Sequence, residues 1–323
     1  MNLMIYSLML MMTLFSMFTP NLYFMWMFLE ISSLSLSIYL NINSFKIYSI
    51  MYFLISSISS ILIIFSILNY SPNMNMNYIL MFSLWLKLGL FPLNTWMNFM
   101  MNKINYKSLL PLLTIIKIIP IIMLLNFTNF NLNIFILLTL ILFPPVILSI
   151  NTSSYPLLLN YSSMYNIPLM LIFSFFNLNF MMSFLLIYMI STIMIILMLK
   201  TSNVYYKNSL NLNLNHKNKL FYNMMMFMYS QLPPFSTFIL KWNLINFILN
   251  LNFKLSLLIM MIIFSSLIMT FNYLNFNNIS YFLSSYKIGH KINQNKNNNI
   301  KFQFIMSLSL MSFTLMFIYL FMD

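Results

Sequence analysis

The segment LWLKLGLFPLNTW, residues 84–96, combines an apolar run, the charged Lys87 inside that run, and the helix breakers Gly89 and Pro92 directly after the charge. Proline removes a backbone hydrogen bond and blocks the preceding turn. At bilayer depth, a broken helix is tolerated only where its freed backbone faces protein or a water-filled cavity. The segment therefore predicts an interrupted membrane helix that carries a lysine at its break.

Composition extends this prediction to the whole chain. Of its 323 residues, 61% are hydrophobic and 5% are charged, whereas about a quarter of a soluble domain is charged. A bilayer crossing takes about 20 residues, so there is room for roughly ten to twelve spans. The first apolar stretch leads directly into further spans, so we expect no cleaved signal peptide. The sequence predicts an all-α polytopic membrane protein, with residues 1–323 forming a single membrane domain.

Apolar runs separated by clusters of Asn, Lys and Ser predict about eleven transmembrane helices. Their approximate limits are 3–18, 22–41, 48–68, 78–99, 108–126, 130–150, 155–176, 179–199, 220–249, 255–276 and 302–321. Eleven of the fifteen lysines fall in even-numbered loops, and only Lys254 falls in an odd one. By the positive-inside rule, this asymmetry places the N-terminus on the positive side and the C-terminus opposite. In a mitochondrion these sides are the matrix and the intermembrane space.

Other features of the composition narrow the class of protein. A net charge of +13 could indicate a nucleic-acid partner, but lysines in membrane-flanking loops explain it better, so none is expected. Cysteine is absent, which excludes disulfides and iron–sulfur ligation, and His216 and His290 both lie in polar segments. We expect no metal and no cofactor in this chain. Alanine and arginine are also absent while methionine is abundant, a bias typical of an A+T-rich organelle gene.

Four ionisable residues fall inside predicted spans, namely Glu30, Lys87, Lys117 and Lys241. A charge at the bilayer centre costs about 2.5–3.5 kcal/mol on insertion scales. A fixed ion pair that joins two helices could explain Glu30 and one lysine, but one carboxylate cannot neutralise three. Loss of water disfavours the charged form of a lysine and makes its proton exchangeable. We therefore favour a proton relay over purely structural pairing.

A second predicted break lies in SQLPPFSTFILKW, where Pro233 and Pro234 precede Lys241. The two broken helices are the fourth members of two five-helix groups, at approximately 1–126 and 130–285. Corresponding interrupted helices indicate a transporter-type site near the midplane. Because five is odd, the groups run in opposite senses, which predicts two inverted five-helix repeats plus a final helix at 302–321.

Further polar residues at bilayer depth could extend a hydrogen-bonded path. The principal candidates, in LNYSSMYNIP, are Tyr161, Ser162, Ser163 and Asn166. Ser32, Ser33, Ser56, Ser57 and Tyr229 are further candidates. For each residue alone, ordinary hydrogen bonding between helices is the simpler explanation.

Five segments together resemble the subunit 2 family of mitochondrial NADH–ubiquinone oxidoreductase, respiratory complex I. FMWMFLEISSLS is similar to the family's W-x-x-L-E-x-x-x-L-S, LWLKLGLFPLNTW to L-K-L-G-x-x-P-x-x-x-W, and TIIKIIP to W-Q-K-x-x-P. LNYSSMYNIP is similar to A-Y-S-S-I-x-H, and LPPFSTFILKW to L-P-P-x-x-G-F-x-x-K-W. Their order and spacing agree with the family's. Asn166 departs from the pattern because it stands where the family usually has histidine.

The resemblance implies an antiporter-like subunit that translocates protons as electrons pass from NADH to ubiquinone. Glu30 and Lys87 would form the input pair, Lys117 the central relay and Lys241 the output group. NADH, FMN, iron–sulfur clusters and ubiquinone are then expected in partner subunits. The expected partners are other membrane-arm subunits and membrane lipids, in a hetero-oligomer of the mitochondrial inner membrane. Two alternatives remain open: a free-standing cation/proton antiporter, and a structural subunit that does not pump.

Overall fold

The computed structural model describes residues 2–69, 74–127, 132–206, 226, 229–230, 236–251 and 256–285. Within these ranges the regular elements are helices, with one isolated β-bridge between Ser154 and Tyr206. The helices are α1 (Asn2–Phe18), α2 (Leu22–Ile42), α3 (Lys46–Leu68), α4 (Met74–Leu88), α5 (Thr95–Met101), α6 (Tyr106–Leu113), α7 (Ile115–Phe127), α8 (Leu132–Ile141), α9 (Phe143–Ile150), α10 (Tyr155–Ser174), α11 (Leu178–Ser202), α14 (Ser236–Leu251) and α15 (Ser256–Ser285).

Six stretches among the described residues are long and apolar enough to cross a membrane. They are Leu22–Ile42, Lys46–Leu68, Tyr106–Phe127, Asn133–Ile150, Leu178–Ser202 and Leu258–Asn275, and two shorter apolar helices accompany them. Backbone groups in lipid must be satisfied within the segment, which only helices and closed barrels achieve. The chain is thus a mostly helical, multi-pass membrane protein. The count of eleven spans stays a prediction, and its last helix, 302–321, lies outside the described residues.

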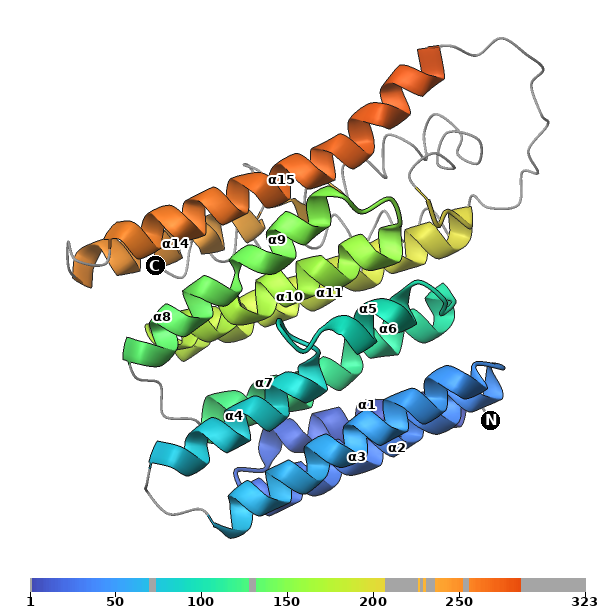
Figure 1. Ribbon diagram of the computed structural model, residues 1–323, viewed down its shortest axis with the longest axis vertical. Helices are drawn as coiled ribbons and strands as arrows, with labels where there is room; N and C mark the ends of the chain where they lie inside the picture. The colour runs from blue at the N-terminus through green and yellow to red at the C-terminus, as the bar shows by residue number, and fades with distance from the viewer. Residues whose placement is uncertain are drawn as a thin grey trace. The chain divides into compact units, whose positions relative to one another are not determined.

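The chain divides into two compact units, one of Met1–Pro145 with Asn160–Leu171, the other of Val146–Leu159 with Ile172–Asp323. In the first unit, α2 packs against α1 and α3, and α3 packs against α4 (Figure 1). Helix α7 contacts α1, α2, α4 and α6. The stretch containing α7 is also the most buried of the six. A polar side chain on α7 is therefore held within protein.

The second unit contains α11, α14 and α15, with α14 in contact with both others. Asn272 on α15 also fastens this helix to α9. Its Nδ2 donates to Ser149 Oγ at 2.5 Å and to the Val146 carbonyl at 3.4 Å. Asparagine side chains form such hydrogen bonds between membrane helices, where no water is available as a partner. The bounds of the two compact units differ from those of the two predicted repeats, 1–126 and 130–285. The repeats stay a prediction.

Three predicted spans, 78–99, 108–126 and 130–150, are each two helices in the structure. The first interruption was expected from Gly89 and Pro92. The second falls at Thr114, whose hydroxyl donates to the Leu110 carbonyl at 2.7 Å, a side-chain bond that competes with the helix ladder. The third falls at Leu142, just before Pro144 and Pro145 in the first turn of α9. Proline has no N–H, so Pro144 and Pro145 cannot bond the carbonyls four residues before them, which interrupts the helix, whereas proline fits a first helical turn.

Candidate functional site

The predicted break at Gly89 is an ordered helix end. Gly89 N–H donates to the Leu86 carbonyl at 3.2 Å, and Leu90 N–H donates to the Trp85 carbonyl at 3.1 Å. This pair of bonds is the Schellman motif, which needs a left-handed residue at its turn. Gly89 supplies that residue with a φ of 65°. Helix α4 therefore stops with Lys87 in its last turn, where the negative end of the helix dipole stabilises a cation.

Replacing Gly89 by alanine should destabilise this end of α4. Left-handed backbone costs a non-glycine residue about 1–2 kcal/mol, and a Cβ here would lie 3.1 Å from Met97 Cβ. We expect Gly89→Ala to lower the thermal stability of the purified protein, measured as its unfolding temperature. Gly89→Asn should fall between alanine and wild type, because asparagine tolerates this backbone region. An unfolding temperature unchanged by Gly89→Ala would contradict this account of the break.

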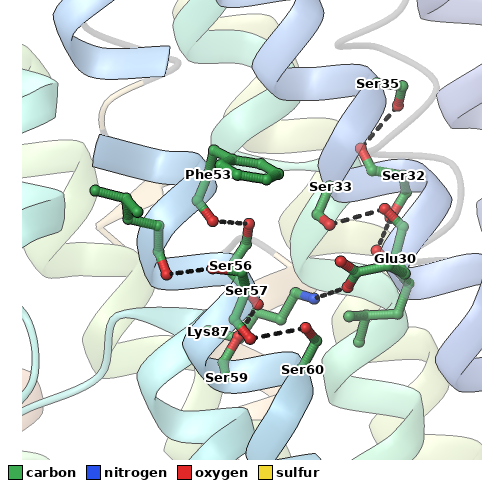
Figure 2. Close-up of polar contacts among 12 residues, drawn as sticks. Glu30, Ser32, Ser33, Ser35, Phe53, Ser56, Ser57, Ser59, Ser60 and Lys87 are labelled. Carbon is green, nitrogen blue, oxygen red and sulfur yellow. Dashed lines mark hydrogen bonds and ion pairs between the residues drawn. The ribbon is translucent and has the colours of Figure 1, made fainter. Parts of the chain in front are cut away.

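Glu30 and Lys87, both predicted from the sequence, form an ion pair between α2 and α4. Figure 2 shows the Lys87 ammonium pointing toward the Glu30 carboxylate, with Nζ 3.6 Å from Oε2. That separation exceeds the roughly 2.7–2.9 Å of a charge-assisted hydrogen bond. The Lys87 side chain is 1% exposed and that of Glu30 is 24% exposed. The pair is therefore a loose contact in which the lysine is buried and the Glu30 side chain is partly exposed, although its paired oxygen Oε2 is buried.

Aromatic side chains with unpartnered polar atoms lie near this pair. Buried Tyr52 on α3 lies near Glu30, and its ring lies 6.2 Å from that of Trp96. The buried Tyr52 hydroxyl and Trp96 indole nitrogen have no hydrogen-bond partner in the part of the chain that the structure describes. Trp26 Nε1, one helical turn before Glu30, is in the same condition. Buried donors of this kind are usually satisfied by ordered water.

The serines around the pair are bonded within their own helices. Ser32 and Ser33 on α2 donate to the carbonyls of Leu29 and Glu30 at 2.9 and 2.8 Å (Figure 2). The hydroxyls on α3 do the same, as a set that comprises Ser56, Ser57, Ser59 and Ser60. Each hydroxyl has one proton, so these serines offer their neighbours only oxygen lone pairs. They can accept from an ammonium or a water, but none supplies a free proton.

Lys117 lies on α7, one turn after the interruption at Thr114. Its side chain is buried, and Nζ donates to Ser163 Oγ on α10 at 2.6 Å. Ser163 in turn donates to the Asn160 carbonyl at 2.7 Å. The sequence contains two acidic residues, Glu30 and Asp323, and the ion pair described above already engages Glu30. The observed partner of Lys117 is thus a neutral hydroxyl.

Replacing Ser163 by alanine should leave the Lys117 amine without its observed acceptor. A buried polar group stripped of its partner costs about 1–3 kcal/mol. We expect Ser163→Ala to lower the free energy of unfolding by that amount, measured by denaturant titration of the purified protein. Ser66→Ala is the matched control, because among the described residues this fully buried serine bonds within its own helix, to the Ile63 carbonyl at 2.7 Å. Equal losses in the two variants would contradict a special role for Ser163.

Sequence reasoning missed two asparagines that lie beside this contact. Asn160 Nδ2 donates to Asn98 Oδ1 at 2.7 Å, and Asn98 Nδ2 donates to the Tyr161 hydroxyl at 3.2 Å. Asn160 is fully buried. Asparagine is common throughout this chain, so its type alone carried no signal. The informative signal was position, because Asn98 lies on the segment just after the break and Asn160 is adjacent to Tyr161.

The remaining predicted residues are distributed as follows. Ser162 and Asn166 are buried on α10. Lys241 lies on α14 in the second unit and is 8% exposed, on the same helix as buried Leu240 and Leu244. Pro92 follows Gly89 in the turn after α4. Pro233 and Pro234 lie outside the described residues.

No protein-family model matches the chain, but two curated relatives do, both named NADH-ubiquinone oxidoreductase chain 2. One, from Apis mellifera ligustica, is 26% identical over 316 residues, which cover 92% of this chain and 90% of the relative. The other, from Artemia franciscana, is 28% identical over 248 residues, which cover 75% and 77%. The resemblance that the motifs indicate is confirmed by these relatives.

Solved structures share the fold. A chain of respiratory complex I from Thermus thermophilus with bound aureothin has a TM-score of 0.76 at 17% identity, over 92% of this chain and 73% of that one. A chain of the membrane-bound sulfane sulfur reductase, an archaeal respiratory membrane complex, has a TM-score of 0.72 at 14% identity, over 97% and 72%. A chain of the Mrp complex from Dietzia sp. DQ12-45-1b has a TM-score of 0.67 at 12% identity, over 86% and 59%.

Proposed function

We propose, from the likeness to curated relatives named NADH-ubiquinone oxidoreductase chain 2, that this chain is an antiporter-like subunit of a respiratory complex and moves protons across the membrane. The solved chains that share its fold come from multi-subunit membrane complexes, which supports a hetero-oligomeric setting. The partners are other membrane-arm subunits and lipids. The membrane is the mitochondrial inner membrane, with the N-terminus in the matrix and the C-terminus in the intermembrane space.

The observation that carries the proposal is the environment of Lys117. Lys117 is 2% exposed, and its Nζ donates to a serine hydroxyl at 2.6 Å. A structural ion pair needs a carboxylate to offset the cost of burying the charge. A hydroxyl is a weaker partner than a carboxylate, so this contact does not offset the burial of a charged ammonium as an ion pair would. A lysine in that setting suits proton transfer better than static helix pairing.

The relay has three steps. Glu30 holds Lys87 protonated, and the 3.6 Å separation makes their contact easy to open. When it opens, the Lys87 proton is released toward Lys117. A proton that arrives on Lys117 repels the one on Lys241 and drives it to the far side. The groups titrate together, so an apparent protonation constant belongs to the chain of groups and not to one lysine.

Energy for this transport comes from partner subunits. Moving one charge against the membrane potential takes about 2.3 kcal/mol per 100 mV. Electron transfer from NADH to ubiquinone supplies it, and NADH, FMN, iron–sulfur clusters and ubiquinone bind elsewhere in the assembly. The chain is thus part of a proton-translocating oxidoreductase, and its own residues carry protons only.

Co-purification tests the assembly directly. Antibody against this chain should precipitate NADH–ubiquinone reductase activity from solubilised membranes, in proportion to the amount of chain recovered. The purified chain alone, reconstituted in vesicles with a pH-sensitive dye, should not exchange Na⁺ or K⁺ for H⁺. Cation-driven proton movement by the isolated chain would instead indicate a free-standing antiporter.

A further inference from the structure

Asn98 on α5 and Asn160 on α10 connect the interrupted helix to the Lys117 site. The Asn160 side chain donates to Asn98 Oδ1 at 2.7 Å, while the Asn160 main-chain carbonyl accepts from Ser163 at 2.7 Å. Ser163 is the residue that accepts from Lys117 at 2.6 Å. One residue, Asn160, therefore holds α5 through its side chain and the hydroxyl partner of Lys117 through its backbone.

Helix α5 depends on such contacts for its position. It spans Thr95–Met101, seven residues, and a helix that short is not stable through its own backbone bonds. It follows directly after the break that ends α4 beside Lys87. Asn98 is engaged at both ends of its amide, since it accepts from Asn160 and donates to the Tyr161 hydroxyl at 3.2 Å. A displacement of α5 would strain both bonds.

We propose that Asn98 and Asn160 are positioning residues that couple the break beside Lys87 to the Lys117–Ser163 hydrogen bond. The inference rests on the proposed relay, and it adds a physical link between the first two lysines. When α5 shifts as the Glu30–Lys87 pair opens, the Asn160 side chain is drawn with it. The turn of α10 that presents Ser163 to Lys117 then changes its position. Coupling of this kind is reciprocal, so a change at Lys117 must also be felt in α5.

Reciprocity gives a test that needs no turnover. Hydrogen–deuterium exchange of the α5 amides, residues 95–101, is measured in the assembled complex for wild type, Lys117→Met, Asn160→Leu and the double variant. We expect Lys117→Met to raise exchange in α5 several-fold in the wild-type background and to change nothing further in the Asn160→Leu background. An increase of equal size in both backgrounds, or none in either, would overturn the proposal.

Asn94 supplies the matched control. It lies directly before α5 and also contacts α10, and its side-chain bond to the described part of that helix is a weak one, from Nδ2 to Met164 Sδ at 3.6 Å. Asn94→Leu should leave the effect of Lys117→Met intact. Asn98→Leu removes the acceptor of the Asn160–Asn98 hydrogen bond and should therefore have the same effect as Asn160→Leu. It replaces that variant if Asn160→Leu does not assemble.

Activity separates this inference from the proposed function. If the relay operates, Asn98→Leu and Asn160→Leu lower the ratio of protons moved to electrons transferred, whereas Asn94→Leu does not. Full pumping in Lys117→Met would refute the relay whatever the exchange data show. Reduced pumping in Lys117→Met with additive exchange effects would refute only the coupling through the asparagines.

Discussion

Lys117→Met in the assembled complex should abolish most proton transfer through this chain while the fold survives. Methionine is similar to lysine in length, and apolar residues of similar volume often replace buried ionic groups without loss of stability. A positioned proton-transfer group contributes on the order of 10²-fold or more to its step. We therefore expect coupled NADH–ubiquinone turnover to fall by about that factor, measured in vesicles together with the proton-to-electron ratio.

Lys103→Met is the matched control for this substitution. Lys103 is an exposed lysine in the turn between α5 and α6, so its loss should leave both turnover and stoichiometry unchanged. If Lys117→Met kept the full proton-to-electron ratio and full turnover, Lys117 would have a structural role and no role in proton transfer. Loss of assembly in Lys117→Met, with Lys103→Met intact, would show instead that Lys117 is needed for the fold.

Breaking the Glu30–Lys87 pair should destabilise the protein more when one partner is removed than when both are. Glu30→Gln leaves the Lys87 ammonium buried without a counter-charge, and such a loss costs about 3–5 kcal/mol in a buried pair. Glu30 keeps 24% of its side chain exposed, so we expect about 3 kcal/mol, at the lower end of that range. Lys87→Met leaves the more exposed member behind and should cost less.

The double variant Glu30→Gln/Lys87→Met separates stability from function. Because neither charge remains, its unfolding temperature should recover most of what Glu30→Gln loses. If the pair serves the relay, proton-to-electron stoichiometry stays low in the double variant. If the pair only joins α2 to α4, stoichiometry should recover together with stability. Unfolding temperature and proton uptake measured on the same preparation distinguish the two results.

Much of the local structure was predictable from the sequence. Apolar runs predicted the limits of α1, α2 and α3 to within two residues, because the hydrophobic length of a span is a local property. Gly89 predicted the break after α4, because a left-handed turn selects for glycine. The breaks at Thr114 and Leu142 were missed. At each break proline or threonine competes with the backbone hydrogen bonds of the helix, and the surrounding structure decides whether the helix ends there.

Partner choice among the polar residues required the tertiary structure. The sequence predicted that Glu30, Lys87 and Lys117 lie inside membrane spans, because each falls within an apolar run. Composition and spacing could not say which lysine pairs with Glu30; only the family resemblance implied Lys87. Nothing in the sequence indicated that Lys117 donates to Ser163, 46 positions away. A membrane helix is apolar on every side, so no amphipathic stripe reveals which face meets which neighbour. Packing of side chains around α7 decides that rotation, and the rotation of each helix decides which polar groups meet.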